Sequence, residues 1–273
     1  MSWNADEPSG EIALIAHRAD GSVSGRLPFA RWAPDERSSL NGRDERTRIE
    51  VDVLHSDVPL IAIGVASTAE LDSVAVAVPP AETSSAVPRD GSTHTRELDV
   101  PALSQYLAAF PDQRGWCSAA ALAMLLQYHG ASDDVPSVAR AVFDTAYSGT
   151  GNWAFNAAHA GARGLRGIVA YLSGIDHVAA FVSAGLPVAI SIGWERDELP
   201  GAPLEHSAGH LLVVRGVEDD LIAVNDPAHP EVATRYPRAA LDRVFRAHGG
   251  VAYLVAPRER TAELVELANG AFP

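Results

Sequence analysis

Apolar and polar residues alternate along the first eighty positions of the chain. The pattern is clear in EIALIAHR, residues 11–18, and in RIEVDVL, residues 48–54, and β-type runs follow at 60–65 and 74–78. A period of two is typical of strands with one buried face. No segment of this part has a convincing helical period, so we predict a small β-rich accessory domain over residues 1–80.

Residues 81–95 break this pattern. The segment AETSSAVPRDGSTHT is rich in Pro, Ser, Thr and charge. It has too few apolar residues to pack, which is typical of a linker. We therefore place a second domain over residues 96–273.

The order of elements changes in this second domain. The segment CSAAALAMLLQYHG predicts a long helix from residue 117 that Gly130 terminates, and shorter helical patterns follow at 136–143, 152–162 and 175–184. Three β-rich segments come later, PVAISIGW, GHLLVVRGV and LIAVNDP, before a last strand at 251–255 and a helix from about residue 260. Helices first and strands later argue for an α+β domain rather than a doubly wound sheet.

Composition narrows the class of protein. The chain has 273 residues, 47% of them hydrophobic and 21% charged, which is the range of folded soluble proteins and is long enough for two domains. Its formal net charge of −14 repels phosphate backbones, so nucleic acid is not an expected partner.

The N-terminal sequence, the length of the apolar stretches and the cysteine content bear on the cellular location of the protein. The single cysteine excludes an intramolecular disulfide. The N-terminus lacks the features of a signal peptide, and no apolar stretch reaches the roughly 18 residues of a membrane span. We expect a cytoplasmic protein as the chain is written, or an exported one if a leader has been removed.

Three residues form a candidate catalytic constellation. Cys117 lies where the long helix begins, and the unpaired N–H groups there favour a thiolate. His210 and Asp226 lie at the outer ends of two apolar runs joined by the polar turn 218–220, so a hairpin puts them opposite one another or one position off. A one-residue change of register would put them on opposite faces. Together they supply a nucleophile, a base and a group that orients the base.

Each of the three also has a purely structural interpretation. A free cysteine is most often a small buried hydrophobe. The histidine can be a satisfied strand-end residue, and the aspartate can stabilise the turn at Asp-Pro.

A series of short segments resembles a known family. They are LDVPALSQY, GWCSAAALAMLLQYHG, TGNWAFNAAHA, GLPVAISIGW, GHLLVVRGV and NDPA, in that order, over roughly two thirds of the chain. The series resembles papain-like cysteine peptidases related to bacteriocin-processing, double-glycine leader peptidases, in their actinobacterial branch. The resemblance implies a papain-like fold, with an N-terminal helical part and a C-terminal antiparallel sheet, preceded by a β-rich accessory domain. It also makes Cys117 the nucleophile, His210 the base and Asp226 the third member.

The resemblance further implies a glutamine that stabilises the oxyanion. Gln105 and Gln113 are the two candidates, twelve and four residues before Cys117, and neither spacing equals the six of the papain pattern. We favour Gln105, because SQ after LDVP matches this branch and an inserted loop alters spacing without moving a side chain. The sequence departs from the branch after Cys117 and Ser118. In the branch Pro-Thr or Pro-Ala usually follows these two residues, whereas here the sequence continues with three alanines. That change affects the helix start and no catalytic group.

Three tryptophans in the matching segments, Trp116, Trp153 and Trp194, are candidate walls of a substrate cleft, or else core aromatics. A zinc peptidase is excluded, because His206 and His210 have the right spacing but no glutamate between them. No nucleotide-binding loop is present either. Neither a metal nor an organic cofactor is implied.

These observations together predict a cysteine peptidase or amide hydrolase that works through a thioester acyl-enzyme on a peptide or amide substrate. A catalytically silent binding module of the same fold, and an acyltransferase or deamidase with the same triad, are the alternatives. The oligomeric state and the identity of the substrate are not readable from the sequence.

Overall fold

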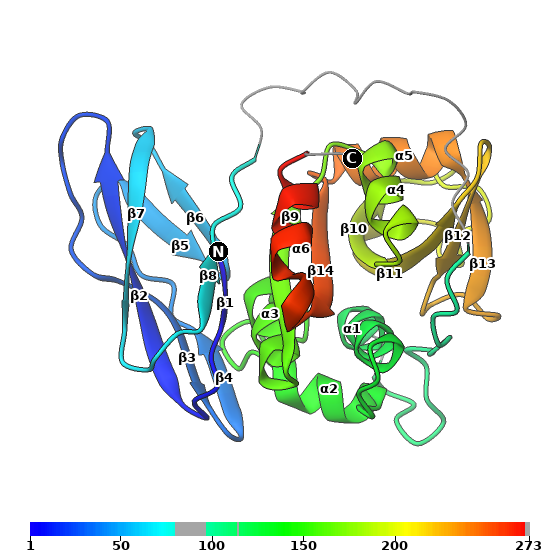
Figure 1. Ribbon diagram of the computed structural model, residues 1–273, viewed down its shortest axis with the longest axis horizontal. Helices are drawn as coiled ribbons and strands as arrows, with labels where there is room; N and C mark the ends of the chain where they lie inside the picture. The colour runs from blue at the N-terminus through cyan, green and yellow to red at the C-terminus, as the bar shows by residue number, and fades with distance from the viewer. Residues whose placement is uncertain (80–96, 114, 271–273) are drawn as a thin grey trace.

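The computed structural model describes residues 1–79, 97–113 and 115–270 (Figure 1). It combines helices with antiparallel sheets and begins with a β-rich region, which confirms the α+β class predicted from the sequence. The predicted linker, residues 81–95, lies outside the described residues. No helix among the described residues is long and apolar enough to cross a membrane.

Eight short strands make up the N-terminal region. They are β1 (Ser2–Asn4), β2 (Gly10–Arg18), β3 (Leu27–Ala33), β4 (Glu36–Ser39), β5 (Thr47–Glu50), β6 (Val53–Ser56), β7 (Leu60–Ser67) and β8 (Ser73–Ala75). Four of them form a sheet in the order β4-β3-β2-β7, and the others pair as β1-β8 and β5-β6. Burial alternates along β2, as its period-two pattern predicts.

One strand prediction in this region is wrong. RIEVDVL was expected to run as a single strand, but the chain turns within it, so that β5 and β6 form a hairpin. Val51 lies in that turn with φ of 58°, and its backbone N–H donates to Asn41 Oδ1 at 2.8 Å. A β-branched residue rarely adopts positive φ, so the alternating pattern gave no sign of a turn here.

The C-terminal region is built on a six-stranded antiparallel sheet in the order β13-β12-β11-β10-β14-β9. Its strands are β9 (Leu165–Tyr171), β10 (Val188–Trp194), β11 (Ser207–Val217), β12 (Leu221–Asn225), β13 (Ala233–Pro237) and β14 (Val251–Pro257). Its helices are α1 (Cys117–Tyr128), α2 (Val135–Val142), α3 (Trp153–Ala162), α4 (Ile175–Ser183), α5 (Arg238–Ala247) and α6 (Thr261–Ala268), with a short 3-10 turn at Arg258–Arg260.

The predicted helices of this region are confirmed to within a residue or two, and Gly130 follows α1 with φ of +90°, as expected of a terminating glycine. Strands β9 and β13 and helix α5 were not predicted from the sequence. β13 is a short edge strand of largely polar sequence, so it has no apolar run to detect. α5 is clearly amphipathic, with its buried residues three or four apart, and its period could have been found.

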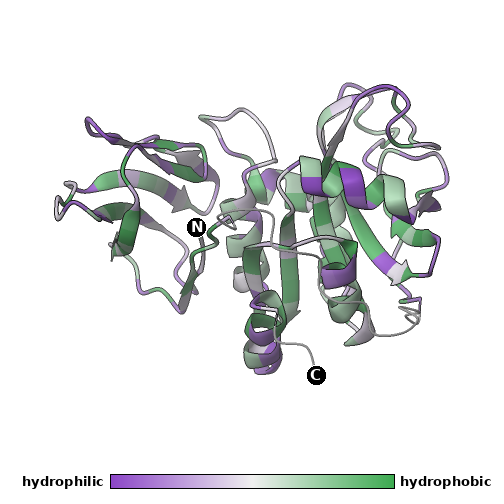
Figure 2. Cartoon of the chain, turned by 90° about the horizontal axis from the view of Figure 1, so that it is seen from above, coloured by the Kyte–Doolittle hydropathy of each residue, from purple (hydrophilic) through white to green (hydrophobic). Residues whose placement is uncertain are grey.

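Helix α1 is the centre of the C-terminal core. Every residue from Ser118 to Leu126 is buried, because the helix packs on β10 and β11 on one side and on α2 and α3 on the others. Hydrophobic residues also line the strands of the large sheet (Figure 2). A helix that is apolar all round has to be enclosed in this way, and the enclosure fixes the position of its first residue, Cys117.

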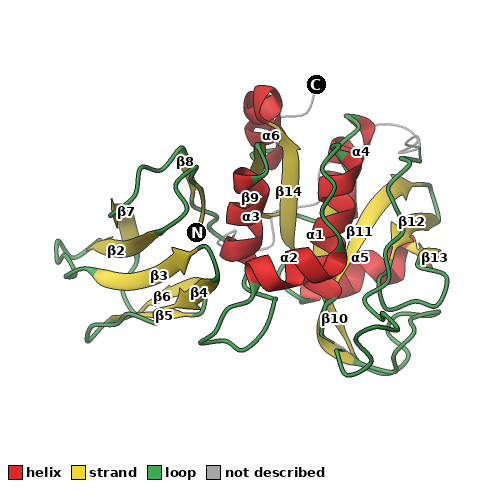
Figure 3. Cartoon of the chain, turned by 90° about the horizontal axis from the view of Figure 1, so that it is seen from below, coloured by secondary structure: helices red, strands yellow, loops and turns green. Residues whose placement is uncertain are grey.

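The N-terminal region is docked against α3 and β9 (Figure 3). The Trp3 ring lies 5.7 Å from the Phe155 ring of α3 and 5.9 Å from Phe29 of its own region. Asn4 donates to the Gly167 carbonyl at 2.8 Å and accepts from the Gly167 N–H at 3.0 Å. Side chains thus satisfy backbone groups of edge strand β9, which would otherwise be open to another strand.

Candidate active site

Cys117 is the first residue of α1. Trp116 occupies the N-cap position without a side-chain hydrogen bond to the helix, so no polar side chain of the cap competes for the first N–H groups. Backbone N–H groups of Ser118 and Leu211 interact with the thiol, whose residue is partly exposed. The helix start therefore holds a sulfur that is both reachable and surrounded by donors, which favours the thiolate.

His210 faces this sulfur from β11, where it pairs with Ile192 of β10. Its Nε2 lies 2.7 Å from Asp226 Oδ1, and the ring also hydrogen-bonds Cys117. The indole of Trp194 meets the imidazole edge-on, with ring centroids 5.8 Å apart and planes at 79°. His210 is only 3% exposed, so its ring orientation is fixed by contacts on three sides.

Asp226 follows directly after β12 and is fully buried. Its Oδ1 accepts from the Ala228 N–H at 2.9 Å as well as from His210, and its Oδ2 accepts from the Tyr236 hydroxyl at 2.6 Å. A buried carboxylate with three donors is satisfied as an anion. The Asp-Pro turn predicted at this point therefore also supports the histidine.

A β-bulge decides that Asp226 lies on the same face of the sheet as His210. Near the turn, Val217 pairs with Ile222, and continuing that register would set Asp226 opposite Val213, on the wrong face. The bulge between Val214 and Gly216 shifts the pairing by one residue, so that Val213 pairs with Asn225. Asp226 then comes opposite Leu212, which is two positions from His210 along β11. The sequence had predicted Asp226 to lie directly opposite His210 or one position away. Diagonal neighbours of this kind are within side-chain reach.

The charges of the three groups reinforce one another. Burial opposes the positive charge of His210, but the hydrogen bonds and negative charges of Asp226 and Cys117 outweigh it and raise the pKa of His210 to about 10. Burial likewise disfavours the thiolate, yet the hydrogen bond and charge of His210 bring the pKa of Cys117 below its ordinary value. The pKa of Asp226 is also lowered, because His210 and Tyr236 outweigh the effect of burial. The geometry favours a thiolate beside an imidazolium ion.

The two candidate glutamines have different environments. Gln105 is buried, at 3% exposure, and its backbone N–H donates to the Pro227 carbonyl at 2.9 Å, directly after Asp226. Gln113 is exposed, in a turn whose N–H donates to the Phe110 carbonyl. The structure thus anchors Gln105 to the loop that carries Asp226.

The three tryptophans are not equivalent. Trp194 is buried and touches His210. Trp116 precedes Cys117 and packs against Phe110, with ring centroids 5.2 Å apart. Trp153 begins α3, and its backbone N–H donates to Asp52 Oδ2 of the N-terminal region at 2.6 Å, which places it at the junction of the two regions.

A buried polar network lies under the start of α1, and the sequence analysis did not identify it. Ser118 Oγ donates to Asn156 Oδ1 at 3.1 Å and lies 3.2 Å from the Tyr253 hydroxyl. Asn156 Nδ2 donates to the carbonyls of Thr150 and Asn152, and Thr150 Oγ1 donates to the Gly115 carbonyl at 3.2 Å. The segment TGNWAFNAAHA therefore holds the loop that precedes the cysteine. The available signal was one asparagine inside a largely apolar helix, Asn156, and a second at its N-cap, Asn152.

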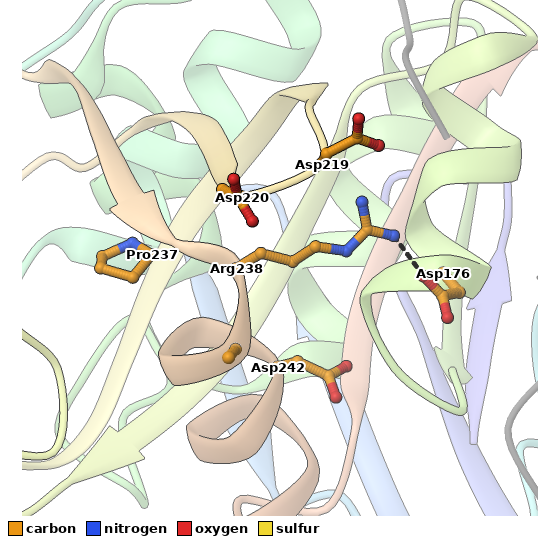
Figure 4. Close-up of a pocket in the computed structure, with 7 residues that line it drawn as sticks. Asp176, Asp219, Asp220, Pro237, Arg238 and Asp242 are labelled. Atoms are coloured by element: carbon orange, nitrogen blue, oxygen red, sulfur yellow. Dashed lines mark hydrogen bonds and ion pairs between the residues drawn. The ribbon is translucent and has the colours of Figure 1, made fainter. Parts of the chain in front are cut away.

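A surface cavity of about 430 Å³ lies elsewhere, where α4, α5 and the β12–β13 side of the sheet meet (Figure 4). Arg238 points across it and pairs with Asp176, and Asp219, Asp220 and Asp242 line its walls. Among the described residues, no group of three or more His, Cys, Asp or Glu side chains is arranged to hold a metal ion.

Comparisons with known proteins identify a family for the C-terminal part of the chain. The model of the Peptidase_C39-like family matches residues 97–253, which is more than half of the chain and includes Cys117, His210 and Asp226. No curated protein matches the chain.

Solved structures resemble part of the chain. One, from Bacillus anthracis, is named as a C39-like peptidase; it shares 17% identity at a TM-score of 0.44 and covers 62% of this chain and 99% of its own. A double-glycine-motif protease from an AMS/PCAT transporter, in complex with a leader peptide, shares 19% identity at a TM-score of 0.41 with the same coverage. The peptidase domain of Streptococcus ComA shares 18% identity at a TM-score of 0.39 and covers 53% of this chain and 93% of its own.

Proposed function

The chain belongs to the Peptidase_C39-like family, and we propose that it is a cysteine peptidase whose nucleophile is Cys117, whose base is His210 and whose orienting group is Asp226. The observation that carries the proposal is the continuous hydrogen-bonded series from the Cys117 thiol through His210 to Asp226 Oδ1. Nucleophile, base and orienting group in contact are what activated thiol chemistry requires.

The proposed reaction has two halves. The Cys117 thiolate attacks the carbonyl carbon of a peptide bond, and the carbonyl oxygen becomes an oxyanion stabilised by the Gln105 side chain and the Cys117 backbone N–H. His210 then gives its proton to the leaving amine, the C–N bond breaks, and a thioester to Cys117 remains. Water attacks the thioester and gives its proton to His210. The C–S bond then breaks, the acid product leaves, and the thiolate–imidazolium pair is restored.

The first test is the rate at which iodoacetamide alkylates Cys117 between pH 5 and pH 9. In the wild-type protein the rate should stay high well below the usual thiol pKa of about 8.5, because His210 stabilises the thiolate. In His210→Ala the rate should fall off near that usual value. A wild-type thiol that titrates as an ordinary cysteine, or does not react, contradicts the proposal.

The second test follows hydrolysis of a mixed peptide library by mass spectrometry. Cys117→Ala and His210→Ala should each abolish cleavage, and Asp226→Ala should remove only part of it, because His210 remains near the thiol. Cleavage at the wild-type rate by Cys117→Ala would end the proposal. Adding a simple primary amine separates hydrolysis from acyl transfer, since transfer gives amide products and hydrolysis gives free acids.

A further inference from the structure

Tyr236 extends the series of contacts by one residue. It lies on edge strand β13, with its side chain completely buried, and its hydroxyl donates to Asp226 Oδ2 at 2.6 Å. That oxygen is the one that does not face His210, whose Nε2 meets Oδ1. The two carboxylate oxygens thus have separate partners on opposite sides.

The hydroxyl has a specific role in this geometry. Ala228 N–H and His210 both contact Oδ1, so neither of them fixes Oδ2. A buried anionic oxygen without a donor is costly, and the carboxylate can turn about its terminal bond until one is found. The Tyr236 hydroxyl donates a charge-assisted hydrogen bond to Oδ2 from a ring that is held by burial. This bond offsets the desolvation cost of the oxygen and prevents the carboxylate from rotating.

Nearby groups keep this hydroxyl a donor. Burial, followed by the negative charge of Asp226, raises the pKa of Tyr236 above its ordinary value, so the proton stays on the tyrosine. Among the described residues, the titratable groups that act on His210 are Asp226 and Cys117, and the ones that act on Asp226 are His210 and Tyr236.

We propose that Tyr236 is a positioning residue of this site, whose hydroxyl holds the Asp226 carboxylate in the orientation that aligns His210 with Cys117. The inference rests on the proposed function and deepens it. It assigns a role to a residue 26 positions beyond the histidine, on a strand that the family-like segments do not include.

The test uses iodoacetate, whose negative charge makes its reaction with Cys117 faster while His210 carries a proton. The rate should fall at high pH, as the imidazolium loses its proton near pH 10 in the wild-type protein. In Tyr236→Phe the Asp226 carboxylate is no longer fixed, so the pKa of His210 should be lower. The fall in the alkylation rate should therefore move to lower pH by roughly one unit. A fall at the wild-type pH would overturn the inference.

Tyr128→Phe is the matched control. It also removes a tyrosine hydroxyl that donates one hydrogen bond, to the Gly185 carbonyl at 3.0 Å, but away from the site. Its pH profile should equal that of the wild type. If Tyr236 served the fold alone, the two variants would differ only in stability and neither would move the profile.

Asp226→Asn shows whether Tyr236 acts through the carboxylate. Removing the hydroxyl should have no further effect on the profile of this variant, because the charge that the hydroxyl positions is gone. If Tyr236→Phe shifts the pH profile equally in the wild-type protein and in Asp226→Asn, the inference is contradicted. An ordinary cysteine in the wild type is a different outcome, which contradicts the proposed function itself.

A further measurement needs no change at Tyr236, in case Tyr236→Phe does not fold. The Tyr236 hydroxyl proton should give a slowly exchanging, downfield NMR resonance in the wild-type protein. It should move upfield in Asp226→Asn, since a neutral amide accepts a weaker hydrogen bond than a carboxylate. A resonance unaffected by that substitution would show that the hydroxyl does not serve the carboxylate.

Discussion

Single buried side chains decide how accurately the proposed nucleophile is placed. Asn156 contacts Ser118 with its oxygen and two loop carbonyls with its nitrogen, and it is completely buried. Each of these groups lacks access to water, so each depends on the others for its hydrogen bond. Asn156 thereby ties the start of α1 to the 150–152 loop, and the Thr150 hydroxyl of that loop holds the Gly115 carbonyl just before Cys117.

We expect Asn156→Ala to lower the free energy of unfolding by about 2–3 kcal/mol, because it leaves several buried polar groups without partners. It should also slow alkylation of Cys117, since the 150–152 loop, whose Thr150 holds Gly115, is no longer fixed. Thermal melting and iodoacetamide kinetics measure the two effects.

Gln127→Ala is the control for this prediction. It removes one side-chain hydrogen bond to a carbonyl, that of Asp133 at 2.8 Å, within the same region of the fold. It should cost less stability and leave alkylation unchanged. If Asn156→Ala melts and reacts like the wild-type protein, the network has no supporting role.

The residues that the sequence analysis found and those that it missed differ in a simple way. Cys117, His210 and Asp226 could be found because each is a reactive residue type at the end of a periodic segment. Tyr236 and Asn156 are ordinary residues whose importance comes from partners 10 and 38 positions away. Only the folded chain shows such contacts.

At the level of elements, helix α3 and strand β9 approach each other closely at Gly167. A Cβ atom added to Gly167 would lie 2.2 Å from the Ala157 carbonyl oxygen, far inside contact distance. Backbone cannot give way as a flexible side chain can, so helix and strand would have to separate.

Gly167→Ala should therefore destabilise the protein by at least about 2 kcal/mol. For a chain of this size that corresponds to a fall in melting temperature of roughly 4–8 °C. Gly25→Ala is the control, because a Cβ there meets no atom within 4 Å and should change little. An unchanged melting temperature for Gly167→Ala would mean that the contact is looser than it appears in the structure.

The bulge in β11 shows where element-level prediction ends. The hairpin from His210 to Asp226 was readable as two apolar runs around a polar turn. The extra residue between Val214 and Gly216 was not predicted, although Gly216 is a sign of it, because a glycine inside a strand often marks a bulge. Yet this residue decides on which face Asp226 emerges.

At the scale of the whole molecule, the N-terminal region and the C-terminal region share a buried junction. Arg166 pairs with Asp72, and Arg258 pairs with Asp6, at the margin of this contact. Asp52 lies within it and accepts the Trp153 N–H. Burial of this carboxyl raises the pKa of Asp52 to about 6.

This carboxyl makes the stability of the molecule depend on pH. Folded Asp52 holds a proton that the unfolded chain gives up near pH 4, so stability should fall as pH rises from about 4 to about 6. Asp52→Asn keeps an acceptor for Trp153 without the charge. It should be more stable than the wild type at pH 7.5, by about 1–2 kcal/mol, and show no such gain at pH 3.5, below the pKa of the unfolded carboxyl.

Asp57→Asn tests whether burial is the cause. Asp57 is exposed, so its carboxylate stays hydrated in the folded protein and the substitution should be nearly neutral at both pH values. A pH-independent effect of Asp52→Asn would contradict the assignment of the raised pKa to the buried carboxyl.

Local sequence was enough to predict the class of the fold, the helix that begins at Cys117, the hairpin that carries His210 and Asp226, and the family to which the segments belong. These properties are local, because periodicity, propensity and motif order are written along the chain. The tertiary structure decided that Gln105 is buried beside the Asp226 loop, that the bulge turns Asp226 toward His210, and that Tyr236 completes its contacts. Those properties depend on how distant strands pair and pack, which no local pattern specifies.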